Sequence, residues 1–102
     1  MTYRVDVTAR AARDLTRIYR RIQAEHSQQA RAWFNELEAL IHRLDEHPSR
    51  GAETPENPTL RQLLHGKKPH LYRVIYEINA HGQKVSVLHI RHGAQAAFTR
   101  VR

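Results

Sequence analysis

Apolar and polar residues in the first part of the chain follow a strand period and then a helix period. Tyr3, Val5 and Val7 alternate with polar residues, which predicts a short strand with one buried face. Thr8 then stands where the N-cap of a helix belongs. From residue 9 to about residue 25 the apolar side chains recur at helical spacing, and arginines occupy the opposite face.

A second helix is predicted from residue 28 to about residue 46. Ser27 offers its N-cap, and the His47-Pro48 step ends it because proline has no N–H to donate. Only one or two residues around Ser27 separate the two helices, so we expect an antiparallel helical hairpin. Trp33 is interpreted as a core residue or as an anchor for a partner.

The second half of the chain has the alternation and the turn residues of β-strands. After a polar loop at residues 49–58, β-prone runs are predicted at residues 59–65, 70–79 and 84–92. Gly82 can supply the positive φ of the last hairpin turn. The order strand-helix-helix-strand-strand-strand predicts a two-layer α+β fold, in which the helical hairpin packs on a small, mostly antiparallel sheet.

Length and composition describe one folded domain. A chain of 102 residues, 40% hydrophobic and 26% charged, is predicted to form a single domain over residues 1–102. It has neither the apolar run of about 18 residues that crosses a bilayer nor the apolar stretch of a signal peptide, so no membrane partner is expected. The absence of cysteine excludes thiolate chemistry and suits the cytoplasm, where we expect the protein.

Charge is unevenly distributed along the chain. Residues 1–58 contain nine arginines and nine acids, whereas residues 59–102 contain eight basic residues and one acid, Glu77. The formal net charge of +7 therefore falls on the predicted sheet and the residues that follow it. Such a surface predicts contact with phosphates or with an acidic protein, and a role in solubility alone is the alternative.

Three segments of the predicted sheet match a known family, together with the entry from the first strand into the first helix. The segments are LRQL at 60–63, YRVIYEI at 72–78 and VLHIRHG at 87–93, and the entry runs from Tyr3 to Ile18. In this order they resemble the RelE/ParE superfamily of toxins from bacterial type II toxin–antitoxin systems. The resemblance extends over nearly the whole chain.

The resemblance implies a growth-inhibiting toxin, of the kind associated with plasmid stabilization, that a cognate acidic antitoxin neutralises. Family antitoxins commonly wrap the toxin with a segment that is disordered when free, which fits a basic sheet. RelE-like members cleave mRNA in the ribosome, whereas ParE-like members poison DNA gyrase. We first expect RNA cleavage. The alternatives are gyrase inhibition without catalysis and a non-toxic relative that acts only as an interaction module.

Metal-free RNA cleavage requires a base, an acid and fixed cations around the scissile phosphate. By resemblance, Arg73 falls on the strand arginine that RelE-like toxins place at this phosphate, and Lys67 and Lys68 lie near the family's basic pair. No cofactor is expected, and the histidines lack partners at the spacing of metal ligands. The candidate catalytic residues are Arg73, Arg91, His92, Lys67 and Lys68.

Two departures count against RelE-like catalysis. Ala94 and Gln95 stand where many family members carry arginines. The region in which some RelE-like toxins have a catalytic tyrosine contains Phe98 and Val101.

Strand register decides whether two arginines can share one phosphate. A two-residue turn at His81-Gly82 pairs Arg73 with Ile90, whereas a slip by one residue sets Arg73 directly opposite Arg91. The sequence leaves both registers open. Glu77 is interpreted as the acid that neutralises one of these arginines and not as a catalytic base.

The first helix offers a second partner surface. Three of its arginines recur at i, i+4 and i+7, either as a solvated face or as a surface for gyrase. The candidate antitoxin- or target-binding residues are Arg61, His89, Arg13, Arg17, Arg20 and Trp33.

Overall fold

The computed structural model describes residues 2–93, and within them the chain forms two α-helices and five strands. In chain order these are β1 (Arg4–Val7), α1 (Ala9–Arg21), α2 (Gln28–His42), β2 (Ala52–Glu53), β3 (Leu60–His65), β4 (Tyr72–Asn79) and β5 (Lys84–His92). Short 3-10 turns at Arg43–Asp45 and Pro48–Arg50 follow α2.

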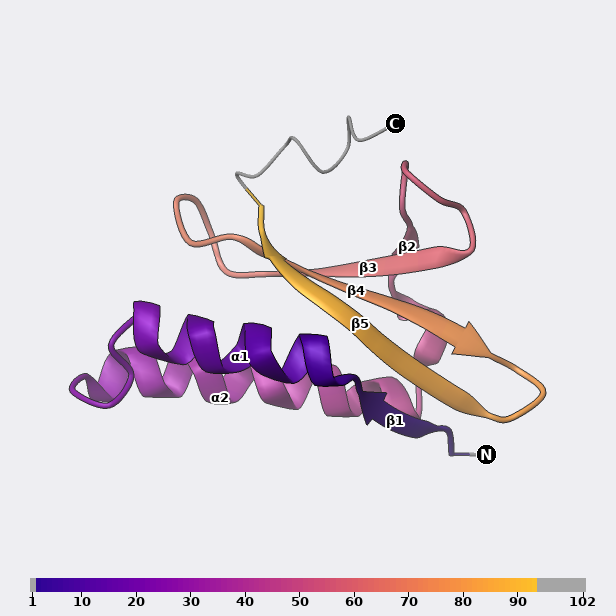
Figure 1. Ribbon diagram of the computed structural model, residues 1–102, viewed down its shortest axis with the longest axis horizontal. Helices are drawn as coiled ribbons and strands as arrows, with labels where there is room; N and C mark the ends of the chain where they lie inside the picture. Colours follow the sequence, from indigo (N-terminus) through magenta and orange to yellow (C-terminus); the bar gives the residue numbers. More distant parts are fainter. Residues whose placement is uncertain (1, 94–102) are drawn as a thin grey trace.

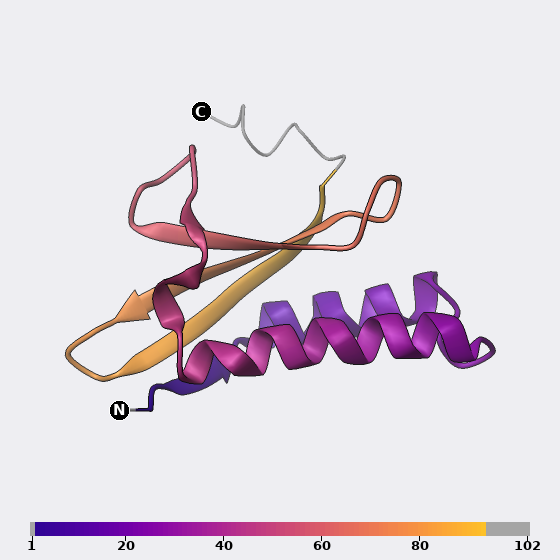
Figure 2. The same ribbon diagram turned by 180° about the vertical axis from the view of Figure 1, so that it is seen from behind.

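The strands form one mixed sheet in the order β1-β5-β4-β3-β2. The β1 strand runs parallel to β5, and the other neighbouring pairs are antiparallel. Both helices lie on one side of this sheet (Figure 1), and α2 runs alongside α1 over its length (Figure 2). The predicted two-layer α+β fold is confirmed.

Both predicted N-caps are present. The Thr8 hydroxyl accepts a hydrogen bond from Ala11 N at 3.2 Å, and the Ser27 hydroxyl accepts one from Ala30 N at 3.1 Å. The predicted link between the helices was too short, because α1 ends at Arg21 and residues 22–27 connect it to α2. Gln23 adopts a left-handed φ of 59°, which cannot continue a right-handed helix.

The core lies between the helices and the sheet. Its side chains come from the predicted apolar faces of both layers, and burial of these faces is the main favourable contribution to folding. On the sheet side, both faces of β4 are buried, since Arg73 and Ile75 on one face and Val74 and Tyr76 on the other are all at most 8% exposed. The helices contribute Ala11, Ile18, Phe34, Leu37 and Ile41, and the facing strands contribute Leu63, Tyr72, Val74, Tyr76, Val85, Val87 and Ile90.

The segment predicted as a loop at residues 49–58 contains strand β2, which the sequence did not indicate. Tyr76, fully buried, donates its hydroxyl hydrogen to Pro48 O at 2.6 Å and accepts from Gly51 N at 2.9 Å. A Cβ at Gly51 would lie 2.5 Å from Gln62 O, so only glycine allows this close approach. Burial raises the pKa of Tyr76, which keeps the hydroxyl protonated as a donor.

No helix in residues 2–93 is long and apolar enough to span a membrane.

Candidate functional site

The register between β4 and β5 changes partway along the strands. Near the turn, Asn79 pairs with Lys84 and Tyr76 with Val87, which is the register that would set Arg73 opposite Ile90. A β-bulge at Leu88 then adds one residue to β5, so that Arg73 lies directly opposite Arg91. The bulge therefore brings the two candidate arginines onto the same face of the sheet.

Arg73 is already bound by an acid from its own chain. Its Nη2 lies 3.1 Å from both carboxylate oxygens of Glu56, and its Nε donates to Gln62 Oε1 at 2.8 Å. The side chains of Arg73 and Glu56 are only 10% and 12% exposed. In this structure the Arg73 guanidinium is therefore engaged by a carboxylate of its own chain through a charge-assisted hydrogen bond.

Glu56 lies in a turn that is closed by hydrogen bonds. The Thr54 hydroxyl accepts from Asn57 N and donates to Asn57 O, and Thr54 N donates to Leu60 O at 2.9 Å. This turn rises beside β3 and returns the chain to the sheet (Figure 2). The acid bound to Arg73 is thus Glu56 and not Glu77, which is exposed and lies opposite Ser86.

Lys67 and Lys68 are exposed in the turn between β3 and β4, at the end of the sheet that also carries Arg73 and Arg91. His92 belongs to the opposite face. Its Nε2 donates to Pro69 O at 2.6 Å, and its ring packs edge-on against Tyr72 at 5.0 Å. The five catalytic candidates therefore share one end of the sheet but are divided between its two faces.

Trp33 packs against aromatic side chains between α2 and the sheet. Its ring centroid lies 4.6 Å from that of His65 and 5.6 Å from that of Tyr72. The ring is half-buried and also lines a hollow of about 740 Å³ beside His92 and Pro69. Trp33 is accordingly a core side chain with one accessible edge, and its interpretation as an anchor for a partner stays a prediction.

Arg61 has backbone partners in the structure. Its Nη1 donates to Gly51 O at 2.6 Å, on the same segment that Tyr76 holds. This contact gives Arg61 a structural role in fixing residues 49–51 on the sheet, whatever partner the protein binds.

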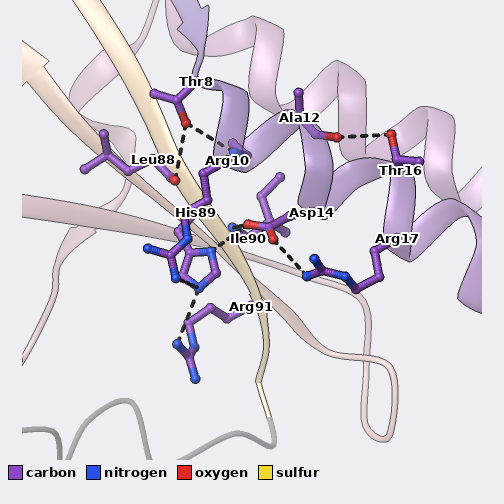
Figure 3. A network of polar contacts seen from close by, with 11 residues as sticks. Thr8, Arg10, Ala12, Asp14, Thr16, Arg17, Leu88, His89, Ile90 and Arg91 are labelled. Atoms are coloured by element: carbon purple, nitrogen blue, oxygen red, sulfur yellow. Dashed lines mark hydrogen bonds and ion pairs between the residues drawn. The ribbon is translucent and has the colours of Figure 1, made fainter.

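A cluster of polar side chains joins α1 to β5 around the buried carboxylate of Asp14 (Figure 3). Asp14 is 4% exposed and lies beyond the end of β1, where β5 has no neighbouring strand among residues 2–93. Its Oδ2 accepts from Ile90 N at 3.0 Å and from His89 Nδ1 at 2.6 Å, and its Oδ1 accepts from Arg17 at 3.2 Å. Asp14 therefore pairs the backbone of the strand edge that β1 leaves open.

His89 is held between this carboxylate and two arginines. Its Nε2 lies 3.4 Å from Arg10 Nη2 and 3.3 Å from Arg91 Nη1. Because guanidinium groups can only donate, Nε2 is the acceptor and the ring proton sits on Nδ1, toward Asp14. Burial lowers the pKa of His89, Asp14 opposes this effect, and the Arg10 and Arg91 charges add to it, so the fold favours the neutral form of His89.

This lowered pKa predicts that the protein loses stability as the pH falls. The unfolded chain protonates His89 near the ordinary value of about 6.5, whereas the folded protein resists protonation to lower pH. The unfolded state thus binds more protons, and the free energy of unfolding should decrease from about pH 7 to about pH 5. Urea unfolding across this range measures the slope. The slope of the free energy of unfolding against pH should become flatter in His89→Gln. It should persist in the control His81→Gln, because His81 lies in an exposed turn. An unchanged slope in His89→Gln would contradict the assignment of this pH dependence to His89.

The helix surface that carries Arg13, Arg17 and Arg20 is exposed. These three side chains line a shallow hollow of about 400 Å³ whose floor is Ala12 and Thr16. The structure therefore brings together the three arginines that the sequence placed on one face of the first helix.

Sequence reasoning missed three residues of these clusters. Glu56 and Gln62 lie far from Arg73 along the chain, and no local pattern connects them. For Asp14 a signal was available, since it falls between Ala11 and Ile18 at helical spacing on the apolar face of α1. A lone carboxylate on such a face indicates a buried acceptor with specific donors. In the described part of the chain, no three His, Asp or Glu side chains are grouped so as to hold a metal ion.

These features define a small α+β domain whose sheet has basic residues at one end. The chain belongs to the ParE toxin family: the family model described as ParE toxin of type II toxin-antitoxin system, parDE, matches residues 5–97. It is thus a toxin of a type II toxin–antitoxin system, within the RelE/ParE superfamily. No curated protein gives a match.

Solved structures support the fold. A chain of the chromosomal ParDE system from P. aeruginosa is 20% identical, with a TM-score of 0.69 over 89% of this chain and 96% of that one. A chain of the RelBE2 toxin–antitoxin complex from Mycobacterium tuberculosis is 22% identical, with a TM-score of 0.65 over 90% of this chain and 99% of that one. A mutant of the E. coli toxin RelE in the free state is 17% identical, with a TM-score of 0.66 over 98% of this chain and 92% of that one. Both branches of the superfamily therefore share this fold.

Proposed function

We propose that this toxin inhibits growth in the cytoplasm by binding DNA gyrase, in the ParE manner, without cleaving RNA. The observation that carries the proposal is the state of Arg73. The arginine that resemblance assigns to the scissile phosphate is buried and bound by the Glu56 carboxylate. A phosphate could reach it only by displacing an internal ion pair, which costs several kcal/mol, on the order of the energy of breaking a buried pair.

RNA cleavage in the RelE manner is the alternative, and one observation favours it. The bulge at Leu88 sets Arg73 opposite Arg91, which is the register that a shared phosphate requires. The basic groups around that pair are divided between two faces, however, because His92 faces Tyr72 and Pro69. Catalysis depends on groups that converge on one phosphate, so this division supports the non-catalytic proposal.

An acidic antitoxin is the proposed neutralising partner. The excess positive charge of the chain lies after residue 58, and Lys67 and Lys68 are exposed there. An acidic, partly disordered segment would be attracted to this end of the sheet and could cover it on folding. The accessible edge of Trp33, in the neighbouring hollow, would accommodate an apolar side chain of the same segment.

The proposal predicts an early arrest of DNA synthesis after the toxin is induced in a bacterial host. DNA and protein synthesis are followed separately by pulse labelling, with Lys67→Gln/Lys68→Gln as a variant that should retain the arrest. The reason is that a gyrase inhibitor does not need these lysines for phosphate chemistry. A collapse of protein synthesis before DNA synthesis would instead indicate RNA cleavage. Normal growth, with the protein shown to be soluble, would contradict the proposal that this chain inhibits growth.

A further inference from the structure

Two like-charged side chains from different elements are held together at the open edge of β5. Arg10 of α1 and Arg91 of β5 both direct a guanidinium nitrogen at His89 Nε2, at 3.4 Å and 3.3 Å (Figure 3). A neutral imidazole nitrogen has one lone pair and no negative charge, so it orients the two cations without neutralising them. The fold therefore brings two positive charges close together at this edge.

Asp14 lies on the other side of the His89 ring, where Nδ1, Ile90 N and Arg17 occupy its oxygens. It is 4% exposed, whereas Arg10 is exposed on the surface of α1. The first turn of α1 contains no acidic residue.

The positive surface continues along α1. Arg13 and Arg17 line the shallow hollow whose floor is formed by the small side chains of Ala12 and Thr16. Arg17 keeps 71% of its side-chain surface exposed although it contacts Asp14. Arg20 is excluded from the edge, because it also borders a groove that contains Glu25 and Glu38.

We propose that the basic edge formed by Arg10, Arg13, Arg17 and Arg91 binds the phosphate backbone of duplex DNA. Planar guanidinium groups bind phosphate oxygens in a fork and remain charged at all physiological pH values. Surfaces for single-stranded nucleic acid add aromatic rings on which bases stack, whereas the hollow between these arginines is lined by the small side chains of Ala12 and Thr16 and by no aromatic ring. A row of cations along a helix suits a regular backbone, and it gives affinity without reading the base sequence.

The test measures binding of the purified full-length protein to a fluorescently labelled 20-base-pair duplex by anisotropy, over a range of salt concentrations. The edge variant is Arg10→Gln/Arg13→Gln. The control, Arg43→Gln/Arg50→Gln, removes the same charge from two exposed arginines in the turns after α2. The slope of log affinity against log salt should become shallower by about 1.8 in the edge variant, about 0.9 for each lost phosphate contact. In moderate salt, its affinity should fall about tenfold or more.

Three results would overturn the proposal: no binding by the unmodified protein, equal losses in the edge and control variants, or tighter binding of a single-stranded RNA of the same length through the same arginines. Amide chemical shifts of the unmodified protein give an answer independent of folding in the variants. Adding duplex should shift residues 9–17 and Arg91 more than residues 43–53, and the reverse would contradict the site. Because the assay contains no gyrase, its outcome is separate from that of the proposed function.

Discussion

Replacing Glu56 with Gln should lower the free energy of unfolding by about 3 kcal/mol or more, since it leaves a buried guanidinium without its carboxylate. The two side chains are 10% and 12% exposed, and Arg73 Nη2 contacts both oxygens of Glu56. Arg73→Met alone should also destabilise the protein, because it leaves the carboxylate without its cation. The double variant Arg73→Met/Glu56→Gln should be markedly more stable than the two single effects predict when added, since it removes both charges together.

Urea unfolding at constant pH measures this cycle. Glu53→Gln is the matched control, because it makes the same chemical change at an exposed position three residues away. It should change the stability by no more than about 0.5 kcal/mol. If Glu56→Gln were as mild as Glu53→Gln, the buried pair would not hold Arg73 in the way described.

Asp14→Asn should lower the free energy of unfolding by about 2–4 kcal/mol, because charged hydrogen bonds are lost and a buried donor is left unpaired. The carboxylate accepts from Ile90 N, His89 Nδ1 and Arg17 with two oxygens, whereas an amide has one oxygen and turns a donor toward these donors. The change therefore weakens the attachment of α1 to the end of β5.

The amide of Ile90 reports this effect locally. Its hydrogen exchange should accelerate in Asp14→Asn by more than the loss of global stability explains, because its acceptor is changed. Asp6→Asn is the control, since Asp6 is 41% exposed and its ion pair with Arg4 lies at the surface. Unchanged exchange at Ile90 would mean that Asp14 does not pair the strand edge.

Local patterns in the sequence were sufficient for most of the fold. The alternation at Tyr3 to Val7, the caps at Thr8 and Ser27 and the last strand at Lys84–His92 are short-range features, and all are present in the structure. Such features depend on the spacing of apolar residues and on single capping residues, and both can be read directly from the sequence.

The site required information that is not local. The bulge at Leu88 decides that Arg73 lies opposite Arg91, and no local pattern in the sequence marks its position. Arg73 pairs with Glu56, which is 17 residues away along the chain and lies in a turn held by Thr54 and Asn57. The sequence could therefore identify candidate cations. It could not show that the fold pairs one of them, Arg73, with an internal acid.

The most direct test of the central claim is the toxicity of Arg73→Met/Glu56→Gln. This variant removes both the proposed structural cation and the acid that binds it, and the stability cycle establishes that it folds. Growth and DNA synthesis are followed after induction, beside the unmodified toxin at equal soluble amounts. A toxin that acts by binding should still arrest DNA synthesis without Arg73. A folded double variant that no longer inhibits growth would contradict this account and would place Arg73 in the chemistry.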